Sequence, residues 1–176
     1  MRSTASCYPQ ARKVKIESAA GDRIQIFELK VLSSENGNIA LNKTASQSST
    51  FGTKSAAFAL DGDVTTSSQT YDTDAWWEVD LGNTFLVKSV IIENKWCEES
   101  HDPNGCLCKL SEATLSLLND DGDVVSAEVI GNKCSVRDCS FDMSSCSQAA
   151  ANDLPARLVT KHSRKRKPRR KRPTRS

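Results

Sequence analysis

Side chains able to carry out acid–base or nucleophilic catalysis are sparse in this sequence of 176 residues. The chain has two histidines, His101 and His162, and neither stands in a pattern that indicates a Ser-His-Asp or Cys-His set. A glycosidase needs two carboxylates facing each other across a cleft, whereas neighbours such as Glu98 and Glu99 are typical of solvated surface. The sequence therefore predicts a non-catalytic protein.

Seven cysteines form the next group with chemistry of its own. This number is high for a reduced cytosolic protein without a metal site, so it favours an oxidising compartment. No Cys-x-x-Cys pair occurs and neither histidine stands at zinc-finger spacing, which argues against structural zinc. We expect a disulfide from Cys97 to either Cys106 or Cys108, because a loop of about ten residues closes readily. The cysteine left over from that choice is a candidate partner for Cys134, and the connectivity stays open because several pairings are compatible with the sequence.

Charge is divided between an acidic body and a basic C-terminal end. Residues 1–156 hold 13 basic and 22 acidic side chains, a net charge of −9, whereas residues 157–176 hold 11 basic and no acidic ones. Such a run is typical of nuclear-localisation or nucleic-acid-binding segments, because counterions released from a polyanion favour association. The charges have no aromatic residues between them, which predicts non-specific, salt-sensitive binding. The candidate polyanion-binding residues are Arg164, Lys165, Arg166, Lys167, Arg169, Arg170, Lys171 and Arg172.

Three other interpretations of the basic end stay open. It would also suit adhesion to anionic glycans or lipid headgroups, or self-association with the acidic body. Alternatively, the sequence from Cys134 onward comes from an aberrant exon or reading frame.

The elements that must position any site are short strands separated by turns. Alternating and β-branched runs predict strands at residues 14–16, 23–32, 76–81, 85–92, 113–118 and 124–130. The Asp121-Gly122 step supplies the positive φ of a tight turn, so residues 115–130 are predicted to form a β-hairpin. Helical periodicity is absent, and strands at this spacing indicate an all-β fold, either a β-sandwich or a jelly roll. Trp76 and Trp77 are adjacent strand positions, so we expect them on opposite faces, with at least one anchoring the core.

The same patterns divide the chain into four parts. We expect a flexible N-terminus at residues 1–12, a packed domain at 13–134, a linker rich in Ser, Cys and Ala at 135–156, and a disordered tail at 157–176. No apolar run has the length of a signal peptide or a membrane span. The missing signal peptide conflicts with the compartment that the cysteines indicate, and a truncated or misassigned start of the chain would remove the conflict.

Four blocks of sequence occur in an order that resembles one known family. They are NIALNKTASQSS at residues 38–49, AAFALDGD at 56–63, WWEVDLG at 76–82, and a strand at 87–95 that leads into the cysteine cluster. In this order the blocks resemble the F-type lectins, or fucolectins, a branch of the coagulation-factor type C (discoidin) superfamily with a galactose-binding-like fold. The resemblance spans about residues 14–130. It implies a β-sandwich jelly roll with a shallow sugar site in the loops at one end and a calcium ion that braces a neighbouring loop.

The resemblance places the family's calcium ligands at Phe58, Asp61, Asp63 and one of Ser67 or Ser68, with Ser68 as our choice. Calcium takes about six to eight oxygen ligands. Phe58 stands where the family usually has Asn, which costs little if only its carbonyl oxygen binds. Asp63 replaces another Asn and adds a negative charge that favours the ion. The family's Cys-Glu pair, which completes the coordination, has no clear counterpart around Cys134, and the alternative is that Asp61-Gly62 is simply a turn.

For the sugar, similar lectins use a loop histidine and two basic residues beside a disulfide. Lys95 and Lys109 stand at the basic positions, but residues 69–71 contain Gln, Thr and Tyr where the histidine is expected. An expanded loop at residues 96–108 separates the two lysines, and lysine lacks the planar fork of arginine, so fucose specificity does not carry over. Trp96 either stacks on a pyranose ring or fills a gap under its own loop.

Together these patterns predict a non-catalytic, carbohydrate-binding module that uses structural calcium and binds a glycan or glycoprotein outside the cell. One alternative is a discoidin-like adhesion module that binds protein or lipid. Another is a nuclear or cytoplasmic protein that binds nucleic acid or other polyanions through its tail. Asn42-Lys43-Thr44 is also an acceptor sequence for N-glycosylation.

Overall fold

The structure, a computed structural model, describes residues 8–19, 22–35, 37–93, 110, 112–130 and 138–144. The chain divides into two compact units, residues 1–146 and 147–176, and every described residue belongs to the first unit. The elements of the described part are β1 (Gln10–Glu17), β2 (Gln25–Ile26), β3 (Glu28–Ser33), β4 (Thr44–Gln47), the 3-10 helix η1 (Ala56–Ala59), β5 (Ser68–Gln69), β6 (Trp76–Glu93), β7 (Thr114–Leu118), β8 (Val124–Val129) and β9 (Asp138–Asp142).

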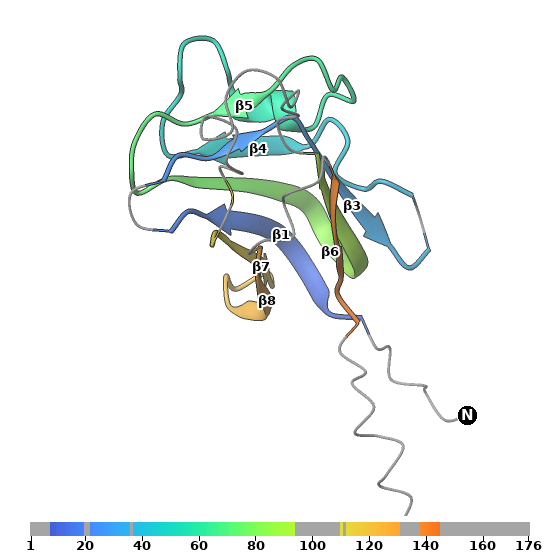
Figure 1. Cartoon of the computed structure of the whole chain (residues 1–176). Coiled ribbons are helices and arrows are strands. Elements are labelled where there is room, and N and C mark those ends of the chain that lie inside the picture. Colours follow the sequence, from blue (N-terminus) through green and yellow to red (C-terminus); the bar gives the residue numbers. More distant parts are fainter. Residues whose placement is uncertain are drawn as a thin grey trace, which may run out of the picture. The chain divides into compact units, whose positions relative to one another are not determined.

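Antiparallel pairing joins these strands into an all-β fold (Figure 1). Seven strands form one sheet in the order β3-β6-β1-β7-β8, with β4 and β9 also paired to β6. Strands β2 and β5 pair with each other separately. The predicted all-β sandwich is confirmed, while the jelly-roll connectivity stays a prediction. Within the described part, no helix is long and apolar enough to cross a membrane.

Strand β6 belongs to both halves of the sandwich because it bends near its middle (Figure 1). Its first half pairs with β1 and β4, and its second half pairs with β3 and β9. The bend includes Gly82, whose φ of +86° is costly for any residue with a Cβ atom. The β1–β6 register also shifts between Ala11 and Lys13, opposite this bend. The two strands predicted at residues 76–81 and 85–92 are therefore one continuous strand.

The core consists of the alternating positions that face inward from both halves of the sheet. Trp77 is 0% exposed and Trp76 is half-buried, as expected for adjacent positions on opposite faces of β6. The buried positions from the β1, β6 and β7 side include Val14, Ile16, Val79, Leu115 and Leu117. Those from the β3, β6 and β9 side are Leu29, Val31, Val90, Ile92, Cys139 and Phe141.

The predicted hairpin at residues 115–130 is present as β7 and β8. Gly122 in its turn has φ +87°, which is the conformation that the Asp-Gly step predicted. By contrast, the strand predicted at residues 23–32 is divided, because β2 pairs with β5 and β3 pairs with β6.

Both predicted ends of the packed domain need a correction. Residues 1–12 were expected to be flexible, but β1 begins at Gln10 and Ala11 is 0% exposed, because both residues pair with β6. The boundary predicted at residue 134 is wrong as well. Strand β9 lies inside the range that we expected to be a linker, and it pairs with β6 from Ser89↔Asp142 to Glu93↔Asp138. Its Cys139 and Phe141 are 1% exposed, so this segment belongs to the core. The Ser- and Cys-rich composition hid a strand because a buried strand needs only its alternate residues to be apolar.

Candidate functional site

The loop between η1 and β5 brings several oxygen atoms around one hydroxyl group. The Thr66 Oγ1 atom lies 2.7 Å from Asp61 Oδ2, 3.0 Å from the carbonyl oxygen of Asp63 and 3.3 Å from the carbonyl oxygen of Phe58. A hydroxyl has one proton to donate, and none of these three acceptors has a proton to give back. This group of four oxygen atoms, called the oxygen cluster below, therefore has only one proton among its members. Most of its lone pairs receive no hydrogen bond from within the group.

Local turn chemistry holds the oxygen cluster in place. The Asp61 Oδ1 atom accepts the Asp63 N–H at 2.9 Å, which is the bond of an Asx turn. Asp63 in turn accepts the hydroxyl and the N–H of Thr65 at 2.6 and 2.8 Å, and these bonds lower the pKa of Asp63. Gly62 between the two aspartates has φ +80°, the left-handed region that favours glycine.

A buried carboxylate, Glu28 at the start of β3, lies against the same loop. Its side chain is 1% exposed, and its Oε2 atom accepts the Gly62 N–H at 3.1 Å. The Oε1 atom is also buried and has no hydrogen-bond partner in the described structure. Burial raises the pKa of Glu28, and the bond from Gly62 opposes this rise. An unpartnered buried carboxylate oxygen is costly unless a cation or a proton compensates for it.

Further negative charge surrounds Glu28. It pairs directly across the sheet with Glu93, and the charges of Asp61 and Glu93 both contribute to raising its pKa. Lys30 partly offsets this charge, and its Nζ atom forms an ion pair with Glu93 Oε1 at 2.8 Å. Glu28 and its surroundings thus combine three carboxylates with one lysine, beside the oxygen atoms of the loop.

These residues fit calcium, because calcium prefers carboxylate, carbonyl and hydroxyl oxygens on a tight loop. The structure brings Phe58, Asp61 and Asp63 together, and Phe58 contributes its carbonyl oxygen to the cluster. No group of three or more His, Cys, Asp or Glu side chains poised for a metal ion occurs among the described residues. The oxygen cluster differs from such a group because two of its four oxygens come from the main chain and a third from a threonine.

Ser68 does not contribute its hydroxyl to the oxygen cluster. Its Oγ atom is buried in β5 and donates to the carbonyl oxygen of Ile26 at 3.4 Å. The neighbouring Ser67 is buried as well and accepts from Gln25. The hydroxyl at the cluster belongs instead to Thr66, which the family pattern did not single out.

Glu28 was also missed as a site residue, although the sequence contains a signal for it. It is the only acidic residue within the apolar run at 24–32, where a buried strand is predicted. A carboxylate in such a strand needs a compensating partner. The partner's position, beside Gly62, is not visible in the sequence because it depends on how β3 packs.

The predicted sugar ligands Lys95, Trp96 and Lys109 lie outside the described residues. The same holds for the disulfide candidates Cys97, Cys106, Cys108 and Cys134, and for the basic residues of the tail at 164–172. Those interpretations stay predictions. In the described segment where the family has its histidine, Gln69 and Thr70 are buried and Tyr71 is exposed.

Trp77 connects the core to the loop. The Trp77 Nε1 atom donates to the carbonyl oxygen of Ala56 at 3.1 Å. Ala56 is the first residue of η1, which leads directly into the oxygen cluster. A fully buried indole thus fixes one end of the loop to the core.

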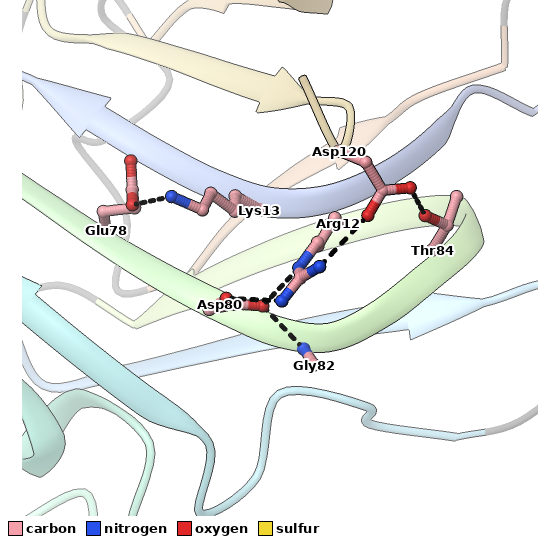
Figure 2. Close-up of polar contacts among 7 residues, drawn as sticks. All are labelled: Arg12, Lys13, Glu78, Asp80, Gly82, Thr84 and Asp120. Carbon is pink, nitrogen blue, oxygen red and sulfur yellow. Dashed lines mark hydrogen bonds and ion pairs between the residues drawn. The ribbon is translucent and has the colours of Figure 1, made fainter. Parts of the chain in front are cut away.

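A second polar group, on β1 and β6, is structural in character (Figure 2). Arg12 donates to both carboxylate oxygens of Asp80 at 3.1 and 3.3 Å and to Asp120 at 3.3 Å. The Asp80 Oδ1 atom also accepts the Gly82 N–H at 2.8 Å, and Asp120 accepts the Thr84 hydroxyl. The bonds from Arg12 and then Gly82 lower the pKa of Asp80, and those from Thr84 and then Arg12 lower that of Asp120. The group fastens the β7–β8 turn to the bend in β6.

Comparisons of the chain with family models, with curated proteins and with solved structures found no match. The resemblance to F-type lectins therefore stays a prediction that depends on the order of the sequence blocks.

Proposed function

We propose that this chain is a non-catalytic glycan-binding module whose loop end is held by calcium. The observation that carries the proposal is the oxygen cluster beside Glu28, whose buried Oε1 atom has no hydrogen-bond partner in the described structure. Calcium would be held by the carbonyl oxygens of Phe58 and Asp63, the side chains of Asp61 and Thr66, and Glu28. When bound, it supplies the positive charge that this set of oxygens lacks.

The chain's own residues explain why a cation here would matter for ligand binding. The oxygen cluster lies within a single excursion of the chain that begins after β4 and returns to β6. Loops of this kind bind ligands well when a scaffold holds them in one conformation, because less conformational entropy is lost on binding. Trp77 fastens the loop at η1, and the oxygen cluster would fasten it before β5.

Glycan binding as the function is supported by the four sequence blocks of the F-type lectin pattern and by the all-β sandwich. A jelly-roll connectivity and an extracellular location, which the cysteine content favours, complete the proposal. Single modules of this class bind sugars weakly, so a sensitive assay must display several copies together.

Isothermal titration of the full oxidised chain tests the proposal, first with calcium and then with fucose, galactose and other neutral monosaccharides. Saturable calcium binding followed by sugar binding that a chelator weakens is the expected result. Calcium binding without any sugar response, on free or multivalent ligands, would instead favour a protein- or lipid-binding adhesion module. Binding of nucleic acid that disappears when residues 157–176 are deleted would assign that activity to the tail alone.

A further inference from the structure

The two exposed aromatic side chains of the described structure occur in neighbouring loops. Tyr71 is 58% exposed and Phe51 is 47% exposed, whereas every other described phenylalanine, tyrosine or tryptophan is buried or half-buried. Phe51 belongs to the loop at residues 48–55 and Tyr71 to the loop at residues 70–75, called the aromatic loops below. Exposed aromatic rings that gather in one place are typical of binding surfaces.

Hydrogen bonds fasten the aromatic loops to each other. The Phe51 N–H donates to the carbonyl oxygen of Gln69 at 2.9 Å, and the Tyr71 N–H donates to Ser49 Oγ at 3.1 Å. Ser49 Oγ also accepts the Asp72 N–H at 3.3 Å and donates to Asp72 Oδ1 at 2.7 Å. The serine hydroxyl thus uses its single proton and both lone pairs. The backbones that carry the two rings are held in register before any ligand arrives.

A hydrogen-bond acceptor is available in the loop that carries Tyr71. Asp72 Oδ1 receives the hydroxyls of Ser48 and Ser49 at 3.0 and 2.7 Å, while Asp72 Oδ2 receives no bond from the described residues. Asp72 is half-buried and directly follows Tyr71 in the chain. An apolar ring face beside a carboxylate oxygen suits a pyranose, which has one apolar face and hydroxyl donors around its rim.

The charges around the aromatic loops select among possible ligands. In residues 22–23, 48–55 and 70–75 the charged side chains are Asp22, Asp72 and Asp74 together with Arg23 and Lys54, a net charge of −1, and the Asp22↔Asp74 bridge joins the first and last of these segments. This small negative charge favours a neutral, hydroxyl-rich ligand over anionic sugars and anionic lipid headgroups.

We propose that Phe51 and Tyr71 form a stacking surface for an uncharged pyranose, with Asp72 accepting a sugar hydroxyl. This inference rests on the proposed glycan-binding function and narrows it to neutral glycans and to two named side chains. The aromatic loops precede and follow the oxygen cluster in the chain, so the cluster lies in the segment that joins the two rings. Ordering of that segment by calcium would therefore fix both rings.

The test uses the full chain, displayed on multivalent streptavidin with calcium present, against an array of neutral, sialylated and sulfated glycans. We expect binding to neutral glycans only. Phe51→Ala and Tyr71→Ala should each weaken it about tenfold, whereas Tyr71→Phe, which keeps the ring, should lose no more than about threefold. Val129→Ala is the matched control, because Val129 is 61% exposed on β8 and lies outside the aromatic loops. Thermal unfolding of all four variants should match the wild type, since the exchanged side chains are exposed.

The outcomes separate this inference from the proposed function. Neutral-glycan binding that persists in both alanine variants would overturn the stacking surface and leave the lectin function intact. Wild-type binding confined to sialylated or sulfated glycans would overturn the charge selection. If the wild type binds no glycan at all but sediments with neutral phosphatidylcholine vesicles through Phe51, both proposals fail and the surface is a membrane contact.

Discussion

Replacing Glu28 by glutamine separates a calcium ligand from an ordinary buried carboxylate. The glutamine keeps the size of the side chain and can still accept the Gly62 N–H, but it removes the charge. Because burial raises the pKa of Glu28 and leaves its Oε1 atom without a partner, the ionised carboxylate destabilises the calcium-free protein. Each unit by which a pKa is raised corresponds to about 1.4 kcal/mol. In EDTA at neutral pH, Glu28→Gln should therefore unfold at a higher temperature than the wild type.

Calcium should stabilise the wild type more than the variant. At a calcium concentration 100 times the wild-type Kd, binding stabilises the native state by about 2.7 kcal/mol. For a unit of 146 residues this is a Tm increase of about 5–11 °C. If the loss of one charged ligand weakens binding about 100-fold, the variant gains only about 0.4 kcal/mol at the same concentration, a shift of about 1–2 °C.

The assay is differential scanning calorimetry of both proteins in EDTA and in calcium, with magnesium as a specificity check. Glu35→Gln is the matched control, because Glu35 is an exposed glutamate outside the oxygen cluster, and it should keep the full calcium shift. A Glu28→Gln protein with an undiminished calcium shift would refute the assignment of Glu28. A wild type without any calcium shift would refute the cation site itself.

Three further predictions follow from the fold. Because burial raises the pKa of Glu28, the native state binds a proton more tightly than the unfolded state. The wild type in EDTA should therefore gain stability as the pH falls through the folded-state pKa of Glu28 toward its unfolded-state pKa. Urea titrations should show that Glu28→Gln lacks this gain, and equal slopes for the two proteins would contradict it. Trp77→Ala should lower the free energy of unfolding by about 3–5 kcal/mol, and Trp76→Ala by much less, because only Trp77 is fully buried. Denaturant titrations measure both values, and equal decreases for the two variants would contradict the central place of Trp77 in the core. Gly82→Ala should lower the free energy of unfolding by about 1–2 kcal/mol, because Gly82 has a positive φ. Gly37 has no such φ and has open space where a Cβ would lie, so Gly37→Ala should leave the free energy of unfolding nearly unchanged in the same experiment.

Much of the fold follows from patterns that act over a few residues. The β7–β8 hairpin was predictable because Asp121-Gly122 fits a tight turn and apolar residues alternate before it. The Asx turn at Asp61 is local in the same sense, so the sequence placed Asp61 and Asp63 on one tight loop. Opposite faces for Trp76 and Trp77 follow from the two-residue repeat of a strand.

What the sequence could not determine are the contacts between segments far apart in the chain. Glu28 and Gly62 are separated by 34 residues, and their bond exists only because β3 packs beneath the loop. Likewise β9 becomes part of the core only by pairing with β6, in a stretch whose composition indicated a linker. The sequence by itself thus determined the strands with a clear alternating pattern, the β7–β8 turn and the aspartates of the loop, since these depend on neighbouring residues. The tertiary structure decided which buried charge lies against that loop and which loops with exposed rings are hydrogen-bonded to each other, because both depend on long-range packing that no local pattern specifies.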